Sequence, residues 1–226
     1  MRADRRWLPR ILVGALALAT GGAAAGGAVM AAGGPPASVA ALRQQVAVAA
    51  ARTEAGGYVA VITGTAVAPV VRVVVSGSDW AEYTRGPGGR DVLVGEKRGC
   101  HYYRRVGPRR FVDQYPLVDL PLLPQRLLGG ATQLGEGTGF DVGQSVQEGA
   151  TRIVTFTDSR APVTVATFRI AGGHVVAAAV DVQGSGQAHL YQAAGFFDIG
   201  HPPALPPPPV RVTPDRLPGA LPAGCS

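Results

Sequence analysis

The chain has 226 residues, a formal net charge of +6 and a hydrophobic fraction of 46%. Residues 1–34 carry four arginines and one aspartate and account for +3 of that charge, so the rest is only mildly basic and no nucleic-acid partner is expected. Between this start and a proline-rich end lie roughly 165 residues, which is enough chain for one domain with its own core.

The first 34 residues have the layout of an export signal. A basic start is followed by the apolar run of residues 11–19 and by a tail of small residues. The apolar run is too short to span a bilayer; with the alanine- and glycine-rich tail added, an N-terminal membrane anchor is the alternative. No cysteine lies near the cleavage region, which excludes a lipid-anchored N-terminus. We therefore expect a protein that is secreted or held in the cell envelope, outside the cytoplasmic membrane.

A helix is predicted at the start of the domain, which we expect to span residues 39–200. Ser38 is a suitable N-cap and Gly56-Gly57 a suitable stop. Between them, apolar residues recur at helical spacing: Val39, Leu42, Val46, Ala49 and Ala50.

Strand signals dominate the chain that follows. Six segments come in quick succession, separated by glycine-containing turns that favour antiparallel hairpins: YVAVITG, APVVRVVVSG, DWAEYTRG, DVLVGE, CHYYRRVG and RRFVDQY. Residues 116–137 are rich in leucine but interrupted by prolines, which predicts one or two short helical turns. Four more strand segments then follow, TRIVTFTD, PVTVATFRIAGG, HVVAAAVDVQG and QAHLYQAAGFFDI, with a hairpin tip at Gly172-Gly173.

Several of these segments are apolar on both faces, as in VVRVVV at residues 70–75. Sheets buried on both faces are usually parallel, but the connections here are too short for parallel crossovers. An antiparallel sheet can bury both faces by packing on a second sheet or by curling around a helix. The order of elements favours an α+β fold, a curved, mostly antiparallel sheet (half-barrel) wrapped around one or two short helices.

This order resembles the LolA/LppX-like superfamily of exported bacterial lipid carriers, which includes the LppX/LprG-type lipoproteins. The likeness is carried by the helix SVAALRQQVAVAAARTE, by SGSDWAEYTRG and CHYYRRVG, by the closing hairpin TFTDSRAPVTVATFRIAGGHVVAAAVDV and by the ending YQAAGFFDIGHPPALPPPP. It implies a half-open antiparallel barrel whose concave face holds acyl chains. The lipobox cysteine of the lipoprotein branch is missing from this chain.

The expected ligand is accordingly lipid-like or otherwise apolar. We predict that the apolar cavity for this ligand is lined by residues of three regions: Val71, Val73, Val75, Leu120, Leu123, Leu127, Val176 and Val180. The alternative is an extracytoplasmic protein-interaction or sensing module on the same fold, with no ligand.

A basic hairpin surrounds the tyrosines of CHYYRRVGPRRF. Four arginines, Arg104, Arg105, Arg109 and Arg110, are predicted to form a surface for a membrane or another partner. Anionic lipid headgroups are the expected negative partner, because each arginine near such a surface is worth about 1 kcal/mol. The alternative is a solvated hairpin in a composition that is rich in arginine throughout, with one lysine in the chain.

Two cysteines, Cys100 and Cys225, are the only ones in the chain. Outside the cytoplasm they can pair and hold the C-terminal tail across the domain; two free thiols or a bridge between chains are the alternatives. Residues 201–226 form a proline-rich tail, which we expect to be extended and polyproline-like.

No constellation of catalytic residues is evident. GQSVQ around Ser145 lacks the second glycine of a nucleophile elbow. GEGTG at residues 135–139 lacks the lysine of a phosphate-binding loop. The four histidines do not have metal-ligand spacing, and acids such as Glu82 and Glu96 fall near predicted turns, where acids are ordinarily solvated. We expect no enzyme, no cofactor and no metal site.

Overall fold

The predicted first helix is present with the predicted ends. In a computed structural model, which describes residues 38–65, 70–108, 110–115, 122–132, 140–160, 163–183, 190–208 and 212–216, helix α2 spans Val39–Gly56. The side chain of Ser38 accepts a hydrogen bond from the Ala41 N–H at 3.2 Å. Gly57 ends the helix in the left-handed region, at φ +68°. The export stretch, residues 1–34, lies outside the described residues.

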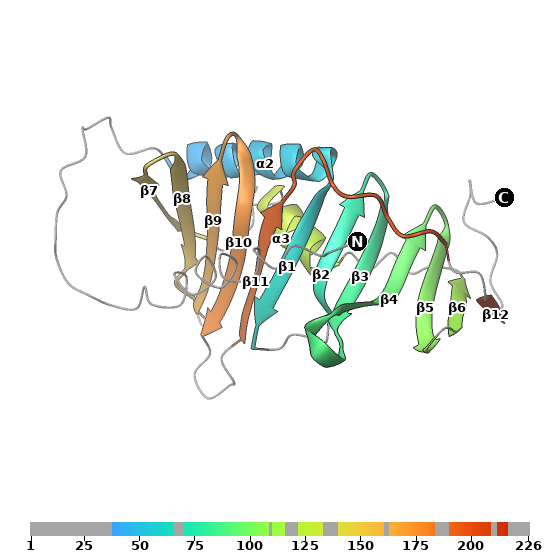
Figure 1. The fold of residues 1–226 in the computed structure, drawn as a ribbon. Helices are drawn as coiled ribbons and strands as arrows, with labels where there is room; N and C mark the ends of the chain where they lie inside the picture. The colour runs from blue at the N-terminus through green and yellow to red at the C-terminus, as the bar shows by residue number, and fades with distance from the viewer. Residues whose placement is uncertain are drawn as a thin grey trace. The chain divides into compact units, whose positions relative to one another are not determined.

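Twelve strands of the described chain form one sheet in the order β12-β6-β5-β4-β3-β2-β1-β11-β10-β9-β8-β7 (Figure 1). Their bounds are β1 Tyr58–Gly64, β2 Val70–Ser76, β3 Asp79–Arg85, β4 Asp91–Arg98, β5 His101–Gly107, β6 Arg110–Tyr115, β7 Val142–Glu148, β8 Thr151–Asp158, β9 Val163–Ala171, β10 His174–Gln183, β11 Leu190–Phe197 and β12 Val212–Arg216. A short 3-10 helix, Pro87–Gly89, joins β3 to β4.

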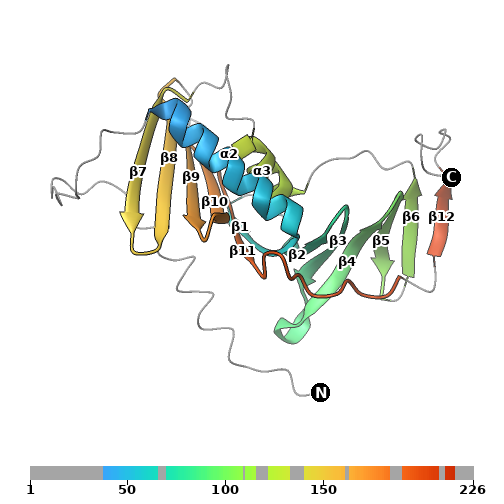
Figure 2. The same ribbon diagram turned by 90° about the horizontal axis from the view of Figure 1, so that it is seen from above.

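The predicted α+β class and the antiparallel hairpins are confirmed. Eleven strands pair antiparallel, and only β12 runs parallel to its neighbour β6. The sheet is neither closed nor strongly curled, which differs from the half-barrel expected. The reason lies in the helices: α2 and α3 (Leu123–Thr132) lie side by side on one face and pack mainly on β1, β7, β9, β10 and β11 (Figure 2). The described helices thus give β4–β6 nothing to wrap around.

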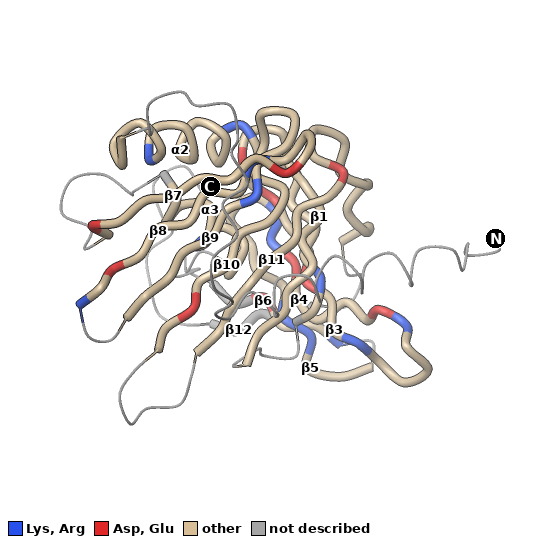
Figure 3. Tube along the Cα trace, turned by 90° about the vertical axis from the view of Figure 1, so that its left-hand side faces the viewer, with Lys and Arg blue, Asp and Glu red and all other residues tan. Residues whose placement is uncertain are grey.

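The main core lies between the helix pair and the sheet. Its largest fully buried side chains are Tyr58, Phe156 and Leu128, and the Tyr58 ring meets Phe196 edge to face at 5.2 Å. Strands β1 and β11 hold no charged residue (Figure 3). No described helix is long and apolar enough to cross a membrane.

A buried threonine connects α2 to an irregular point of the sheet. The ladder between β10 and β9 shifts register between Val175 and Ala177. At this bulge the Thr53 hydroxyl oxygen accepts a hydrogen bond from the Val175 N–H at 2.9 Å, and the carbonyls of Ala49 and Val175 lie within 3.3 Å as acceptors. The side chain therefore satisfies backbone groups that the bulge takes out of the ladder.

The chain after β11 is part of the folded structure. Residues 198–208, the strap, begin with Ile199 packed against the main core and then run along the strand ends from β11 toward β6, on the side of the sheet opposite the helices (Figure 1, Figure 2). Gly200 donates a backbone hydrogen bond to the Gly57 carbonyl at 3.0 Å. Within the predicted proline-rich tail, residues 201–208 continue the strap and β12 adds an edge strand. That edge position suits Pro214, which has no N–H to donate to the ladder.

Candidate functional site

Most of the residues predicted to line an apolar cavity lie in one cluster on the helix-bearing face. Val73 and Val75 on β2 are 0% and 2% exposed, and Leu127 on α3 is 6% exposed. Leu123 and Val180 are partly buried and pack against the same cluster. The structure therefore places these five side chains in or against one core cluster between the helix pair and the sheet.

The other predicted lining residues are placed differently. Val71 and Val176 are half-buried and sit at register shifts in β2 and β10, where the alternation of faces is interrupted. Val175, not singled out from the sequence, is the fully buried member of β10 at this point. Leu120 lies outside the described residues. The register shift interrupts the alternation of faces, so the sequence pattern predicts Val176 where the structure buries Val175.

A polar pair borders the apolar cluster on the same face. Glu82 on β3 has Val73 and Gly95 as cross-strand neighbours. The Tyr102 hydroxyl on β5 donates to Glu82 Oε2 at 3.3 Å, and the Tyr102 ring lies 5.2 Å from that of Trp80. A Cβ at Gly95 would lie 2.7 Å from the Tyr102 hydroxyl and 3.0 Å from Glu82 Oε2. Glycine at this position therefore leaves the space in which the acid and the phenol meet.

The surroundings of this pair shift both of its pKa values. Burial raises the pKa of Glu82 above its ordinary value, and the hydrogen bond from Tyr102 offsets part of that rise. Burial, together with the Glu82 carboxylate, raises the pKa of Tyr102 to about 12. The prediction of a solvated acid near a turn is wrong for Glu82, because the residue lies inside β3 with a shielded side chain. The pair offers a hydroxyl donor and a carboxyl beside apolar side chains.

The opposite face holds a fully buried carboxylate. Glu96 on β4 is 0% exposed, so the expectation of a solvated acid is wrong here too. Arg98 Nη2 lies 3.4 Å from Glu96 Oε2 and also donates to the Pro206 carbonyl of the strap. Burial raises the pKa of Glu96, and Arg98 lowers it in part. Arg98 therefore links the strap to the sheet and compensates a buried charge.

The predicted arginine surface is divided between two faces. Arg104 and Arg105 are consecutive in β5, so their side chains point to opposite sides of the sheet. The Arg105 guanidinium donates to the carbonyls of Leu93, Gly107 and Pro108, at 3.3, 2.9 and 2.8 Å. Arg104 and Arg110 are exposed, and Arg109 lies outside the described residues. Arg105 is thus held within the turn between β5 and β6.

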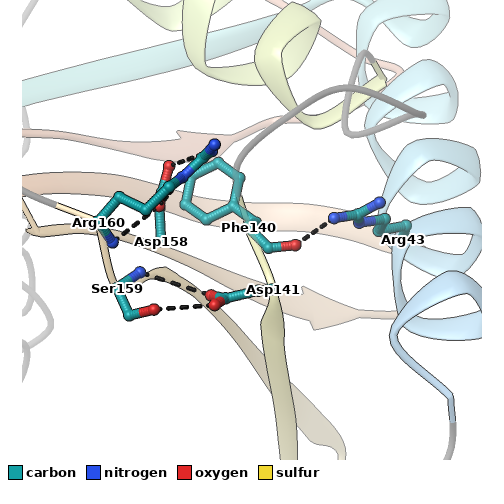
Figure 4. Close-up of polar contacts among 6 residues, drawn as sticks. All are labelled: Arg43, Phe140, Asp141, Asp158, Ser159 and Arg160. Carbon is teal, nitrogen blue, oxygen red and sulfur yellow. Dashed lines mark hydrogen bonds and ion pairs between the residues drawn. The ribbon is translucent and has the colours of Figure 1, made fainter.

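Polar contacts tie the start of β7 to its neighbours (Figure 4). Asp141 Oδ2 accepts from the Ser159 hydroxyl at 2.8 Å, and Arg43 of α2 donates to the Phe140 carbonyl. Asp158 Oδ1 accepts from Arg160 Nε at 3.0 Å. These contacts join chain segments at an exposed end of the sheet. Within the described ranges no group of three or more His, Cys, Asp or Glu could hold a metal ion.

Cys100 lies in the turn between β4 and β5 and is disulfide-bonded. Cys225 lies outside the described residues, so the pairing of these two cysteines stays a prediction.

No protein-family model and no curated protein matches the sequence.

Proposed function

We propose that the protein binds an apolar, lipid-like ligand on the helix-bearing face of the sheet, outside the cytoplasmic membrane. The observation that carries the proposal is the apolar cluster beneath the helix pair, which the Glu82–Tyr102 pair borders on the same face. An acyl chain needs apolar side chains along its length and hydrogen-bonding groups at its head. The proposal is supported by their arrangement on one face of the sheet. The apolar side chains of Val73 and Val75 on β2 lie beside the hydrogen-bonding groups of Glu82 on β3 and Tyr102 on β5.

Helix α3 is the part of the cover that a ligand can most easily displace. It has ten residues, including Pro124, Gly129 and Gly130. Helices this short are marginal on their own, and each glycine costs about 1 kcal/mol relative to alanine. Its position therefore depends on side chains buried against α2 and the sheet, chiefly Leu127 and Leu128.

The free energies involved are comparable. Burying Leu127 and Leu128 stabilises the docked helix by about 1.5–3 kcal/mol each. A bound acyl chain gains about 0.8 kcal/mol for each CH₂ group removed from water. Roughly four to eight methylene groups therefore offset the loss of these two leucine contacts. Ordinary acyl chains are longer than this, so exchange of α3 for a ligand is thermodynamically accessible.

The resemblance to the LolA/LppX-like superfamily supports the same proposal. The chain shares its order of a first helix, antiparallel strands, a short helix and further strands. We propose the half-barrel as the finer description of the ligand-bound fold, with the sheet bending around the ligand. The basic residues and the apolar run within residues 1–34 support the proposed export.

A second candidate function, an extracytoplasmic protein-interaction or sensing module, is favoured by one observation. Val73, Val75 and Leu127 pack in the core with almost no exposed surface. Under this alternative the cluster serves stability alone, and α3 stays docked.

Uptake of a fluorescent fatty acid distinguishes the two functions. We expect uptake by the wild type and faster uptake by Leu127→Ala, because that change weakens α3 docking by about 2–5 kcal/mol. Val154→Ala is the matched control, since Val154 is a 0% exposed core residue of β8, away from α3. Absence of uptake, or equal acceleration by both substitutions, contradicts the proposal.

A further inference from the structure

Strand β7 is an edge of the sheet that no other described segment covers. Among the described residues it pairs only with β8. In an antiparallel pair, every second residue of an edge strand directs its N–H and C=O groups away from its neighbour. Val142 is 44% exposed and Val146 60% exposed, and these valines lie on one side of the strand. The strand thus presents backbone hydrogen-bonding groups together with apolar side chains.

Edge strands are normally blunted by a bulge, a proline, a lysine or a covering segment. The opposite edge of this sheet has such cover, because β12 with its Pro214 lies beside β6. Strand β7 pairs with β8 over seven residues without a register shift. It contains no proline and no lysine, and Glu148 at its end is its single charge.

The strand is also held firmly in place. An ideal Cβ at Gly143 would lie 3.3 Å from a Leu42 methyl carbon and 3.4 Å from one of Val39. Helix α2 therefore rests directly on the inner face of β7. A strand fixed in its extended form loses little conformational entropy when another strand joins it.

The sequence of β7 is complementary to itself in the antiparallel direction. When Gln144 of one copy lies opposite Gln144 of another, Val142 of each copy lies opposite Val146 of the other. Two cross-strand pairs of Val142 with Val146 then form on one face, on either side of the Gln144–Gln144 pair. None of these three pairs contains a charged residue. Direct cross-strand neighbours have Cβ atoms about 4.5–5.5 Å apart, so these pairs make contact.

We propose that the protein forms a twofold-symmetric dimer in which β7 of two copies pair antiparallel through Val142, Gln144 and Val146. The sheet then continues across the symmetry axis, and one interface buries both valine pairs. The helix-bearing face is separate from this edge, so the dimer is independent of ligand binding.

Analytical ultracentrifugation of the exported chain across a concentration series tests the dimer. We expect a concentration-dependent dimer whose dissociation constant rises at least about tenfold in Val146→Lys, because both valine pairs are lost together. Val48→Lys is the control, since Val48 is 39% exposed on α2 rather than on β7. Circular dichroism and unchanged fatty-acid uptake show that each variant is folded.

Cysteine crosslinking tests the register. We expect Gln144→Cys to form a covalent dimer under mild oxidation and Ser145→Cys to form much less, because only position 144 lies opposite itself. A wild type that stays monomeric up to about 1 mM, or a dimer equally stable in Val146→Lys, overturns the proposal. So does a monomer whose β7 edge binds an extended peptide, since the occupant is then another protein.

Discussion

The two faces of the sheet are buried by different means. On the helix-bearing face, Val73 and Val75 are covered by an apolar layer to which α2 and α3 contribute. On the other face, Val74 and Ala81 lie in one row with Glu96, all at most 2% exposed. The described segment on that side is the strap, whose Pro206 carbonyl accepts a hydrogen bond from Arg98, the ion-pair partner of Glu96.

This difference explains why VVRVVV is apolar in both directions. When helices shield one face of a strand and an extended segment shields the other, neither face of its inner residues is exposed to solvent. Arg72 lies on the face of the sheet that carries the strap. Its guanidinium stacks 4.4 Å above the Tyr83 ring and lies 3.0 Å from Asp91 Oδ2. A second sheet is not needed to bury both faces.

The strap face should be the more sensitive one to loss of a single charge. Arg98→Met leaves Glu96 buried without its counterion, and breaking such a pair costs about 3–5 kcal/mol. We expect a large fall in the urea midpoint of unfolding. The double variant Glu96→Gln, Arg98→Met should recover most of the loss. A single variant within about 0.5 kcal/mol of the wild type contradicts the role of this ion pair.

The helix face should be sensitive to loss of a buried hydroxyl. Thr53→Val keeps the shape but leaves the Val175 N–H without its acceptor, which costs about 1–3 kcal/mol. Chemical denaturation measures this loss. Thr63→Val is the control, since Thr63 is an exposed β1 residue. Equal stability of the Thr53 variant and the wild type would show that Thr53 does not hold α2 to the bulge.

Glu82 and Asp158 should respond to pH in opposite directions. Burial raises the pKa of Glu82, so its contribution to stability is present below about pH 4.5 and is lost as pH rises through the folded pKa. Glu82→Gln should therefore gain stability relative to the wild type at neutral pH and no longer do so in acid. The pKa of Asp158 is lowered by Arg160, so Asp158→Asn should lose stability at neutral pH. Because the Asp158 contribution is lost only as pH falls below the ordinary pKa of an aspartate, unfolding measured from about pH 2 to about pH 8 checks both signs. The same sign for both residues contradicts this account.

The exposed arginines should have the smallest effect. We propose that Arg104 and Arg110 attract anionic membrane surfaces, each contributing about 1 kcal/mol. Replacing both with glutamine should weaken cosedimentation with anionic vesicles, and salt should weaken it further, because exposed charges are screened over about 10 Å at 0.1 M. Equal binding to neutral vesicles removes the proposal.

Local signals predicted much of the fold. The Ser38 cap and the Gly57 stop define α2, and Gly172-Gly173 forms the turn between β9 and β10 with positive φ at both residues. Strand β7 was missed, because an exposed edge strand carries polar residues and shows no apolar alternation. Strand β12 was missed for a related reason, since Pro214 and the prolines that precede the strand in the chain favour an extended tail.

The candidate site was predicted only in its apolar part. The valines and leucines of the sequence predict a buried layer, because apolar side chains are stabilised by removal from water. The Glu82–Tyr102 pair depends on three neighbouring strands and on Gly95 between them. The burial of Glu96 depends on a strap that lies more than one hundred residues away in the chain. Neither arrangement leaves a short-range pattern in the sequence.

Native mass spectrometry of the protein purified from its own host tests the central claim most directly. The account predicts a bound lipid-like molecule, released by organic solvent and absent from a folded Leu123→Lys variant, because Leu123 lies on α3 beside the apolar cluster. Val48→Lys, on the outer side of α2, should retain it. A ligand-free mass for the wild type, with no uptake of added fatty acid or phospholipid, would contradict the account and leave the interaction module as the function of this fold.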